Sequence, residues 1–138
     1  MSIGIRGFAF SLAAAILLAP FTALTAAAAK GDPVSVKLTY TECEGCHTFR
    51  ENKVGPKHCG VVGRKAASLT DYPSYFEALR SSGLAWDVKT LDEFLAEPYS
   101  YLPGTAMGYV GISDKESRVD LTAYMALMGS DPNICGVK

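Results

Sequence analysis

The chain has 138 residues, of which 13 are Lys or Arg and 14 are Asp or Glu, so its net charge is close to neutral. This length fits one small domain. The balanced charge excludes a polybasic nucleic-acid-binding protein, and we expect no nucleic-acid partner.

Residues 1–29 have the organisation of a cleaved signal peptide. A positively charged start precedes an apolar run over residues 8–18, and small alanines at positions 27–29 match a cleavage site. An uncleaved membrane anchor is the alternative, but it needs roughly 20 unbroken apolar residues and Pro20 interrupts the run. We therefore expect an exported domain of residues 30–138, soluble in the periplasm once the leader is removed.

Few regular elements are expected in the first half of this domain. Apolar and polar residues alternate along residues 30–41, a pattern compatible with a strand. Residues 43–63 are rich in glycine and predict a long loop. Residues 75–82 predict a short helix that Gly83 ends.

Two capping boxes predict helices in the second half. The first opens at Thr90, and its helix ends before Pro98. The second opens at Ser113 and starts the longest helix, which Gly129 ends. The apolar face of this helix is predicted to contain Val119, Leu121, Met125 and Met128. A small chain with so many loops needs a central group to pack against.

The segment Cys43-Glu44-Gly45-Cys46-His47 has the pattern through which c-type haem is attached covalently. Two thiols on one turn can reach the two vinyl groups at one edge of a porphyrin. The histidine that follows at once then lies under the ring with its imidazole towards the iron. We therefore expect one covalent haem c, with His47 as an iron ligand.

Three alternatives use the same cysteines without haem. A zinc site needs a second Cys/His pair at comparable spacing, and His58-Cys59 is badly spaced for this role. A thioredoxin-like dithiol needs a βαβ context, which the sequence lacks. A disulfide between Cys43 and Cys46 leaves His47 unexplained. A structural zinc or disulfide module without haem therefore stays open but less favoured.

The second axial ligand of the iron has four candidates: Met107, Met125, Met128 and His58. Met125 and Met128 lie on a predicted apolar helix face, where core packing explains them. His58 is too near Cys46 in sequence to cross easily to the far side of the ring. Met107 follows Pro103 in an extended loop outside any helical periodicity, so it is the favoured ligand.

Several motifs now occur in a single order: CEGCH, NKVGPKHCGVVGRK, Trp86, YLPGTAMGYVGI and DLTAYM. Together they resemble class I cytochrome c, with the greatest similarity to bacterial cytochrome c2 and the mitochondrial protein. The resemblance covers about residues 43–129. It implies a small all-α fold of about three to five short helices, with long loops wrapped round one haem.

The resemblance also implies individual roles. Cys43 and Cys46 would form the thioethers, and His47 and Met107 would be the axial ligands. The carbonyl of Pro56 would accept the Nδ1–H of His47 and orient its ring. The buried haem propionates would be bound by Arg64, Tyr75, Trp86 and Thr105.

The sequence departs from the family pattern at several positions. Ser35 and Thr39 stand where relatives carry a glycine and an aromatic residue, so the N-terminal helix is expected to be shorter, absent, or shifted with Leu38 and Tyr40 inward. Phe94 replaces a tyrosine whose hydroxyl reaches the methionine sulfur. The lysines that ring the haem edge in mitochondrial forms are mostly missing, which predicts weak electrostatic steering.

His58-Cys59 replaces the usual Leu-His of the family. With two cysteines used by haem, Cys59 and Cys135 remain in an oxidising compartment. In the family fold the segment after Pro56 passes near the end of the last helix. We therefore expect a disulfide between Cys59 and Cys135 rather than two free thiols, and we expect His58 to lie at the surface.

The resulting expectation is a monomeric, periplasmic single-electron carrier, not an enzyme, because histidine and methionine leave the iron no open position. Its partners would be redox proteins: a membrane oxidase, a bc-type complex, a photosynthetic reaction centre or a periplasmic dehydrogenase. Contact with a membrane complex would be transient. The alternative is a haem peroxidase or a small-ligand-binding sensor with a labile Met107, which the loss of the tyrosine at Phe94 favours.

Overall fold

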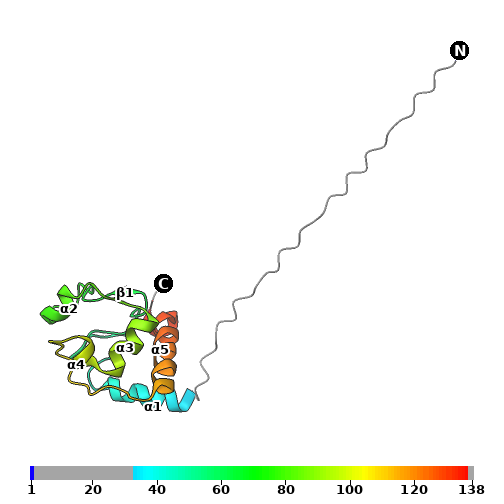
Figure 1. Ribbon diagram of the computed structural model, residues 1–138. Coiled ribbons are helices and arrows are strands. Elements are labelled where there is room, and N and C mark those ends of the chain that lie inside the picture. The colour runs from blue at the N-terminus through cyan, green and yellow to red at the C-terminus, as the bar shows by residue number, and fades with distance from the viewer. Residues whose placement is uncertain (2–32, 137–138) are drawn as a thin grey trace.

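The computed structural model describes Met1 and residues 33–136, so the predicted signal peptide lies, apart from Met1, outside the described residues. The described chain folds into short helices, one pair of two-residue strands and long loops (Figure 1). The elements are α1 (Pro33–Glu44), β1 (Arg64–Lys65), α2 (Glu77–Ser81), β2 (Ala85–Trp86), α3 (Val88–Ala96), α4 (Pro98–Tyr101), α5 (Lys115–Ser130) and α6 (Pro132–Cys135). The predicted small, mainly helical fold is confirmed.

The N-terminal segment forms helix α1, so the strand pattern over residues 30–41 was misleading. Val36 and Tyr40 are four residues apart and both are buried, which places them on one helical face. Leu38, which would face inward in the shifted-helix alternative, is 63% exposed, whereas Tyr40 is only 1% exposed. Packing of α1 against α5 selects the helix over the local alternation.

The two predicted helices of the second half form, but each is capped by an aspartate near the expected residue rather than by that residue. Asp87 accepts a hydrogen bond from the Thr90 backbone N–H at 2.7 Å, so α3 begins at Val88 rather than at Thr90. Asp114 accepts one from the Ser117 N–H at 2.7 Å and starts α5. Aspartate is a strong N-cap because its carboxylate satisfies free N–H groups and favours the positive end of the helix.

Helix α5 buries only part of its predicted apolar face. Leu121 and Met125 are buried in the core, as expected. Val119 is exposed, because it lies on the opposite side of the helix from Leu121. The helix continues past Gly129 to Ser130, and a short α6 follows it.

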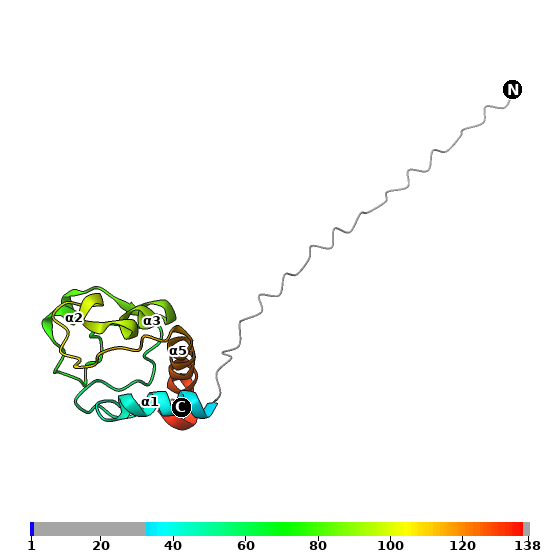
Figure 2. The same cartoon turned by 60° about the horizontal axis from the view of Figure 1, so that its bottom comes forward.

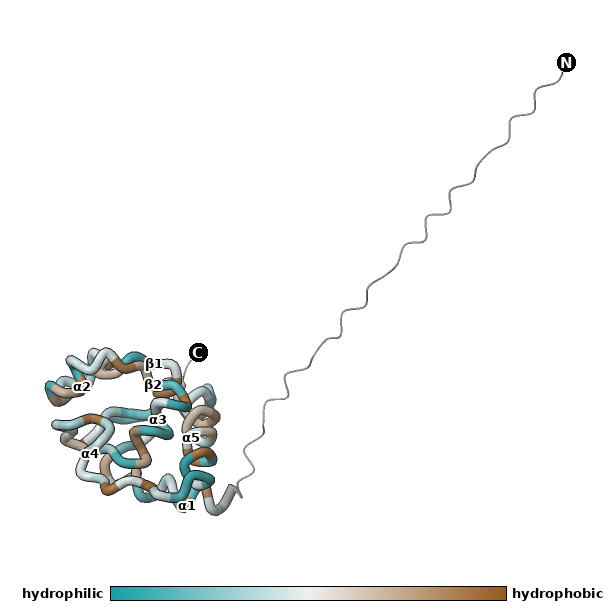
Figure 3. Tube along the Cα trace, in the orientation of Figure 1, coloured by the Kyte–Doolittle hydropathy of each residue, from teal (hydrophilic) through white to brown (hydrophobic). Residues whose placement is uncertain are grey.

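The core lies where α1 and α3 both pack against α5 (Figure 2). Apolar residues also occur along the loops between the helices (Figure 3), so loops contribute to the core. Its largest members are aromatic: Tyr40, Tyr72, Tyr75, Trp86 and Phe94. Full burial of such a side chain stabilises a fold by about 1.5–3 kcal/mol, which compensates for the shortness of the helices.

Gly129 lets the 58–60 segment cross directly over α5. A Cβ atom at this position would lie 3.0 Å from the carbonyl oxygen of His58. The Gly60 N–H donates to the Gly129 carbonyl at 2.8 Å. This crossing fixes the loop that follows Pro56 against the C-terminal half of α5.

No helix within residues 33–136 combines the length and the apolar character needed to cross a membrane.

Candidate functional site

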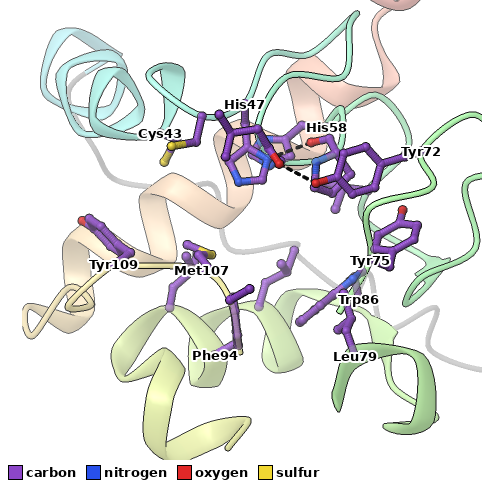
Figure 4. A pocket seen from close by; sticks show the side chains of 18 of the residues that line it. Cys43, His47, His58, Tyr72, Tyr75, Leu79, Trp86, Phe94, Met107 and Tyr109 are labelled. Carbon is purple, nitrogen blue, oxygen red and sulfur yellow. Dashed lines mark hydrogen bonds between the residues drawn. The ribbon is translucent and has the colours of Figure 1, made fainter. Parts of the chain in front are cut away.

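A cavity of about 380 Å³ lies between α1, α3, α5 and the loops that join them (Figure 4). Its lining is mainly apolar and includes Val61, Leu79, Leu91, Phe94 and Leu95. Loops 45–63 and 102–114 supply residues on its two sides. A flat apolar group could therefore be enclosed between them.

Two free thiols stand at one edge of this cavity. The end of α1 continues into a turn in which the N–H groups of Cys46 and His47 both donate to the Cys43 carbonyl, at 3.1 and 2.9 Å. This turn brings both thiols and the imidazole to the cavity lining. The structure leaves Cys43 and Cys46 unbonded to each other, contrary to the disulfide alternative.

The environment of Cys43 also differs from that of a reactive dithiol. Burial, with smaller contributions from Glu42, Glu44 and Cys46, raises the pKa of Cys43 to about 11. A redox-active cysteine of the thioredoxin kind needs a lowered pKa, because the thiolate is the nucleophile. The thioredoxin-like alternative therefore loses support.

His47 is held with one ring nitrogen bound to the protein and the other free. Its Nδ1 lies 2.7 Å from the Pro56 carbonyl oxygen, and because a carbonyl only accepts, Nδ1 carries the proton. Burial lowers the pKa of His47, and the bond to Pro56 opposes this shift. The neutral ring thus keeps the Nε2 lone pair available for a metal.

Gly55 provides the space in which the His47 ring lies. A Cβ atom at Gly55 would come within 2.5 Å of His47 Nε2 and closer still to Cε1. Such distances are far below van der Waals contact, so any side chain here would displace the ring. Gly55 therefore leaves room for the His47 ring, and Pro56 orients it through the hydrogen bond to Nδ1.

Met107 lines the cavity on the side facing His47 (Figure 4). Its backbone N–H donates to the Thr105 hydroxyl at 3.3 Å, and its carbonyl accepts from the Tyr109 N–H at 2.9 Å. These bonds fix the loop on both sides of the methionine. Met125 also lines the cavity but from the buried face of α5.

The predicted propionate-binding residues are only partly brought together. Arg64, Tyr75 and Trp86 line the same cavity, and β-pairing sets Arg64 opposite Trp86. The Arg64 guanidinium donates to the carbonyls of Cys59 and Lys57 at 2.8 and 2.9 Å. Thr105 is buried in the same loop as Met107, to whose N–H its hydroxyl is bonded, and it does not line the cavity.

His58 is buried, so its predicted surface position is wrong. It is 8% exposed, and its ring stacks on that of His47 with centroids 4.4 Å apart. Its Nδ1 lies 3.0 Å from the Tyr40 hydroxyl. The signal was present in the sequence: a residue that takes the place of a family leucine is expected in the core.

Sequence reasoning also missed two tyrosines of the cavity and their hydrogen-bond partners. Tyr72 donates its hydroxyl hydrogen to the Val54 carbonyl and packs edge-on against Tyr75. Tyr109 donates to a Glu42 carboxylate oxygen at 2.6 Å. Neither pair could be found from spacing, because the partners lie far apart along the chain.

The structure pairs Cys59 with Cys135 in a disulfide, as predicted. The two residues are separated by 76 positions, and their Cα atoms are 5.5 Å apart. The bond fixes the loop after His58 to α6, directly beside the crossing at Gly129.

The donor set of the cavity fits covalently attached haem better than a metal ion alone. Two free thiols stand at one edge, an imidazole with a free nitrogen faces apolar space, and a thioether lies across from it. Within residues 33–136 no group of three or more His, Cys, Asp or Glu side chains could hold a metal ion. A structural zinc site thus has no support among these residues.

Comparison with known proteins agrees with this chemistry. No protein-family model matches the chain. Cytochrome c2 of Rhodomicrobium vannielii is 39% identical over 101 residues, which cover 71% of this chain and 80% of the relative. Cytochrome c2 of Rhodopila globiformis is 43% identical over 98 residues, covering 69% of this chain and 92% of the relative.

A solved structure supports the same assignment. Cytochrome cH from Methylobacterium extorquens superimposes with a TM-score of 0.66 at 40% sequence identity, covering 70% of this chain and 99% of that one. Fold, cavity and relatives agree, and the chain belongs to the class I cytochrome c family as an electron carrier with one covalently attached c-type haem.

Proposed function

We propose that this protein is a periplasmic one-electron carrier whose haem iron is bound axially by His47 and Met107. The observation that carries the proposal is the 2.7 Å bond between His47 Nδ1 and the Pro56 carbonyl. It fixes the tautomer that leaves Nε2 free on the side of the cavity facing Met107.

Each residue of the cavity then has a role in holding the cofactor. Cys43 and Cys46 form the two thioethers at the exposed edge. Arg64 would offset the charge of a buried propionate and Tyr75 and Trp86 would donate hydrogen bonds to it, because such a charge is costly without partners. Thr105 is proposed to bind the other propionate, although its hydroxyl accepts the Met107 N–H at 3.3 Å.

The haem supplies a ferrous–ferric couple, and a thioether ligand favours the ferrous state and raises the potential. The protein contributes a closed apolar surrounding and two ligands that leave no open position for a substrate. Because both axial positions of the iron would be filled, we propose an electron carrier rather than an enzyme.

The leader of residues 1–29 supports export and a periplasmic location. The partners are redox proteins of that compartment: a membrane oxidase, a bc-type complex, a reaction centre or a periplasmic dehydrogenase. We propose that the protein meets them as a monomer in transient contacts. Stopped-flow oxidation and reduction of the haem against each candidate identifies the partners.

Substitution of the two cavity methionines tests the ligand assignment. The oxidised wild-type holoprotein is expected to show the weak long-wavelength charge-transfer band of a methionine–iron bond. Met107→Ala should abolish this band, whereas Met125→Leu, a change at a buried residue of the same cavity, should retain it. Loss of the band in the Met125 variant alone would overturn the assignment.

A second candidate function rests on Phe94, which lines the cavity and has no hydroxyl group to donate towards Met107. A weakly held methionine would leave iron open to peroxide or a small ligand. Absence of the charge-transfer band in the wild type at neutral pH, with turnover of hydrogen peroxide, would favour this function.

A further inference from the structure

His58 is a buried polar side chain that the proposed electron-carrying site does not yet explain. Its ring lies against the face of the His47 ring, with centroids 4.4 Å apart and planes inclined by 22°. Both rings line the cavity (Figure 4). Close, nearly parallel contact of this kind restricts how far the His47 ring can rotate.

The Tyr40 hydroxyl fixes the orientation of the His58 ring. The hydroxyl oxygen lies 3.0 Å from His58 Nδ1, and Tyr40 is only 1% exposed. Tyr40 is itself held by stacking on Phe49, with centroids 4.7 Å apart, and by contact with Tyr124 on α5. The hydroxyl therefore has little freedom to move away from His58.

The backbone of His58 is equally fixed. Its N–H donates to the Thr48 carbonyl at 2.8 Å, and its carbonyl passes over Gly129. The next residue, Cys59, is tied to Cys135 by the disulfide. The imidazole thus stands on a rigid support that includes α1, α5 and α6.

The hydrogen bond from His47 to Pro56 and the contact with His58 restrain different movements. The bond to Pro56 holds one point on the edge of the His47 ring at 2.7 Å. A single bond at Nδ1 leaves the ring free to tilt about that point. Contact with the face of the His58 ring blocks this tilt on one side. The space left by Gly55 sets how far the His47 ring can tilt on the other side.

An apolar side chain of similar size could fill the same space without needing a buried partner. An imidazole needs one, because an unpaired polar group in the core is destabilising. The chain supplies this partner from a different element, the Tyr40 hydroxyl on α1. An imidazole held in this way makes the surroundings of His47 more polar than an apolar residue would.

We propose that His58 is a positioning residue for His47: its imidazole, oriented by the Tyr40 hydroxyl, sets the plane of the His47 ring and keeps the surroundings of that ligand polar. The inference rests on the proposed role of His47 as an iron ligand. Groups around a ligating histidine determine its orientation and tune the metal.

The test compares four variants of the intact holoprotein. His58→Leu removes the polar ring and approximately keeps the volume. Tyr40→Phe keeps the His58 ring but removes its hydroxyl partner. Tyr124→Phe is the matched control, because it removes a hydroxyl from the same aromatic cluster without touching His58. The fourth, His58→Leu combined with Tyr40→Phe, shows whether the two changes act on one group.

Two readouts separate positioning from packing. The proton shifts of the four haem methyl groups in the oxidised protein depend on the plane of the axial histidine, and voltammetry gives the reduction potential. His58→Leu should reorder the methyl shifts and raise the potential, because a more apolar surrounding favours the less charged ferrous iron. Tyr40→Phe should change the methyl shifts and the potential in the same direction as His58→Leu, but by less. In the double variant, Tyr40→Phe should add little to the effect of His58→Leu.

Wild-type methyl shifts and potential in both His58→Leu and Tyr40→Phe would overturn the inference, even if the denaturation midpoint falls. If His58→Leu does not mature, Tyr40→Phe against Tyr124→Phe decides alone. A wild-type spectrum without histidine ligation would overturn the proposed function itself, and the inference with it. Normal wild-type ligation with unchanged variants overturns the inference only.

Discussion

The Tyr109 hydroxyl donates to a Glu42 carboxylate oxygen at 2.6 Å, joining residues that are 67 positions apart. Tyr109 belongs to the loop that carries Met107, and Glu42 precedes Cys43 at the end of α1. Burial, followed by the bond to Glu42, raises the pKa of Tyr109, so the phenol stays protonated and continues to donate. The pair holds the methionine loop against the haem-attachment turn at the mouth of the cavity.

Tyr109→Phe should loosen this loop while leaving the ring in place. A hydrogen bond of this kind contributes about 1 kcal/mol, so the affinity of the ferric protein for added imidazole should rise about fivefold. The measurement is a titration followed in the Soret band. Tyr99→Phe is the control, because Tyr99 is an exposed tyrosine near the same loop. Equal affinities in the two variants would contradict the role of the Glu42 contact.

Gly55→Ala should displace the His47 ring. The added Cβ would lie within 2.5 Å of Nε2, so the ring must tilt or the loop must move. We expect loss of most low-spin ferric signal, measured by electron paramagnetic resonance, together with poor maturation. Gly45→Ala is the matched control in the same loop, because its Cβ would meet no atom within 4 Å. A normal spectrum for Gly55→Ala would show that the ring is not confined at this position.

Removing the disulfide by replacing Cys59 and Cys135 with serine should destabilise the holoprotein. The bond joins residues 76 positions apart. In the chain-entropy model, closing a loop of this length raises the free energy of unfolding by about 4–5 kcal/mol. Covalent haem already restricts the unfolded chain, so we expect a loss of about 2–4 kcal/mol in guanidinium denaturation.

The same bond predicts the behaviour of the native protein towards alkylating reagents. With both haem-attachment cysteines consumed, the folded holoprotein should take up no label until a reductant is added. Intact mass then increases by two labels. A shift of two labels without reductant would show that Cys59 and Cys135 are free in solution.

Electron transfer to partners should depend weakly on ionic strength. The cavity lining includes Val54, which is 77% exposed, and the acidic Glu42, and the lining residue Tyr109 is followed by Val110, which is 85% exposed. Second-order rate constants should change less than about threefold between about 0.01 and 0.15 M salt. Val110→Lys should increase this dependence for an acidic partner. A steep dependence in the wild type would require a charged contact elsewhere.

The parts of the site that depend on local chemistry could be predicted from sequence. The turn from Cys43 to His47 has its own spacing rule, and Pro56 and Met107 are recognised from the motifs around them. The disulfide of Cys59 with Cys135 followed from the resemblance together with the export signal. These features need little knowledge of how distant segments pack.

The parts that depend on packing could not be predicted. Alternation along residues 30–41 suggested a strand, and only contact with α5 makes Val36 and Tyr40 one buried face. The surface position predicted for His58 is wrong because its burial depends on the Tyr40 hydroxyl, which lies 18 positions away along the chain. The Tyr109–Glu42 bond joins a loop to a helix end that no spacing rule connects.

The pairing of Cys59 with Cys135 sets an order for maturation. Four cysteines allow three pairings, and in the unfolded chain Cys46 lies far nearer to Cys59 than Cys135 does. Loop-closure entropy favours Cys46–Cys59 over Cys59–Cys135 by about 1–2 kcal/mol. Haem attachment removes this competition, because it consumes both thiols of the CxxCH turn and leaves Cys59 a single partner. A chain that forms a disulfide through Cys43 or Cys46 before it meets haem could not attach the cofactor, and rescue would require a thiol reductant in the compartment where the protein matures.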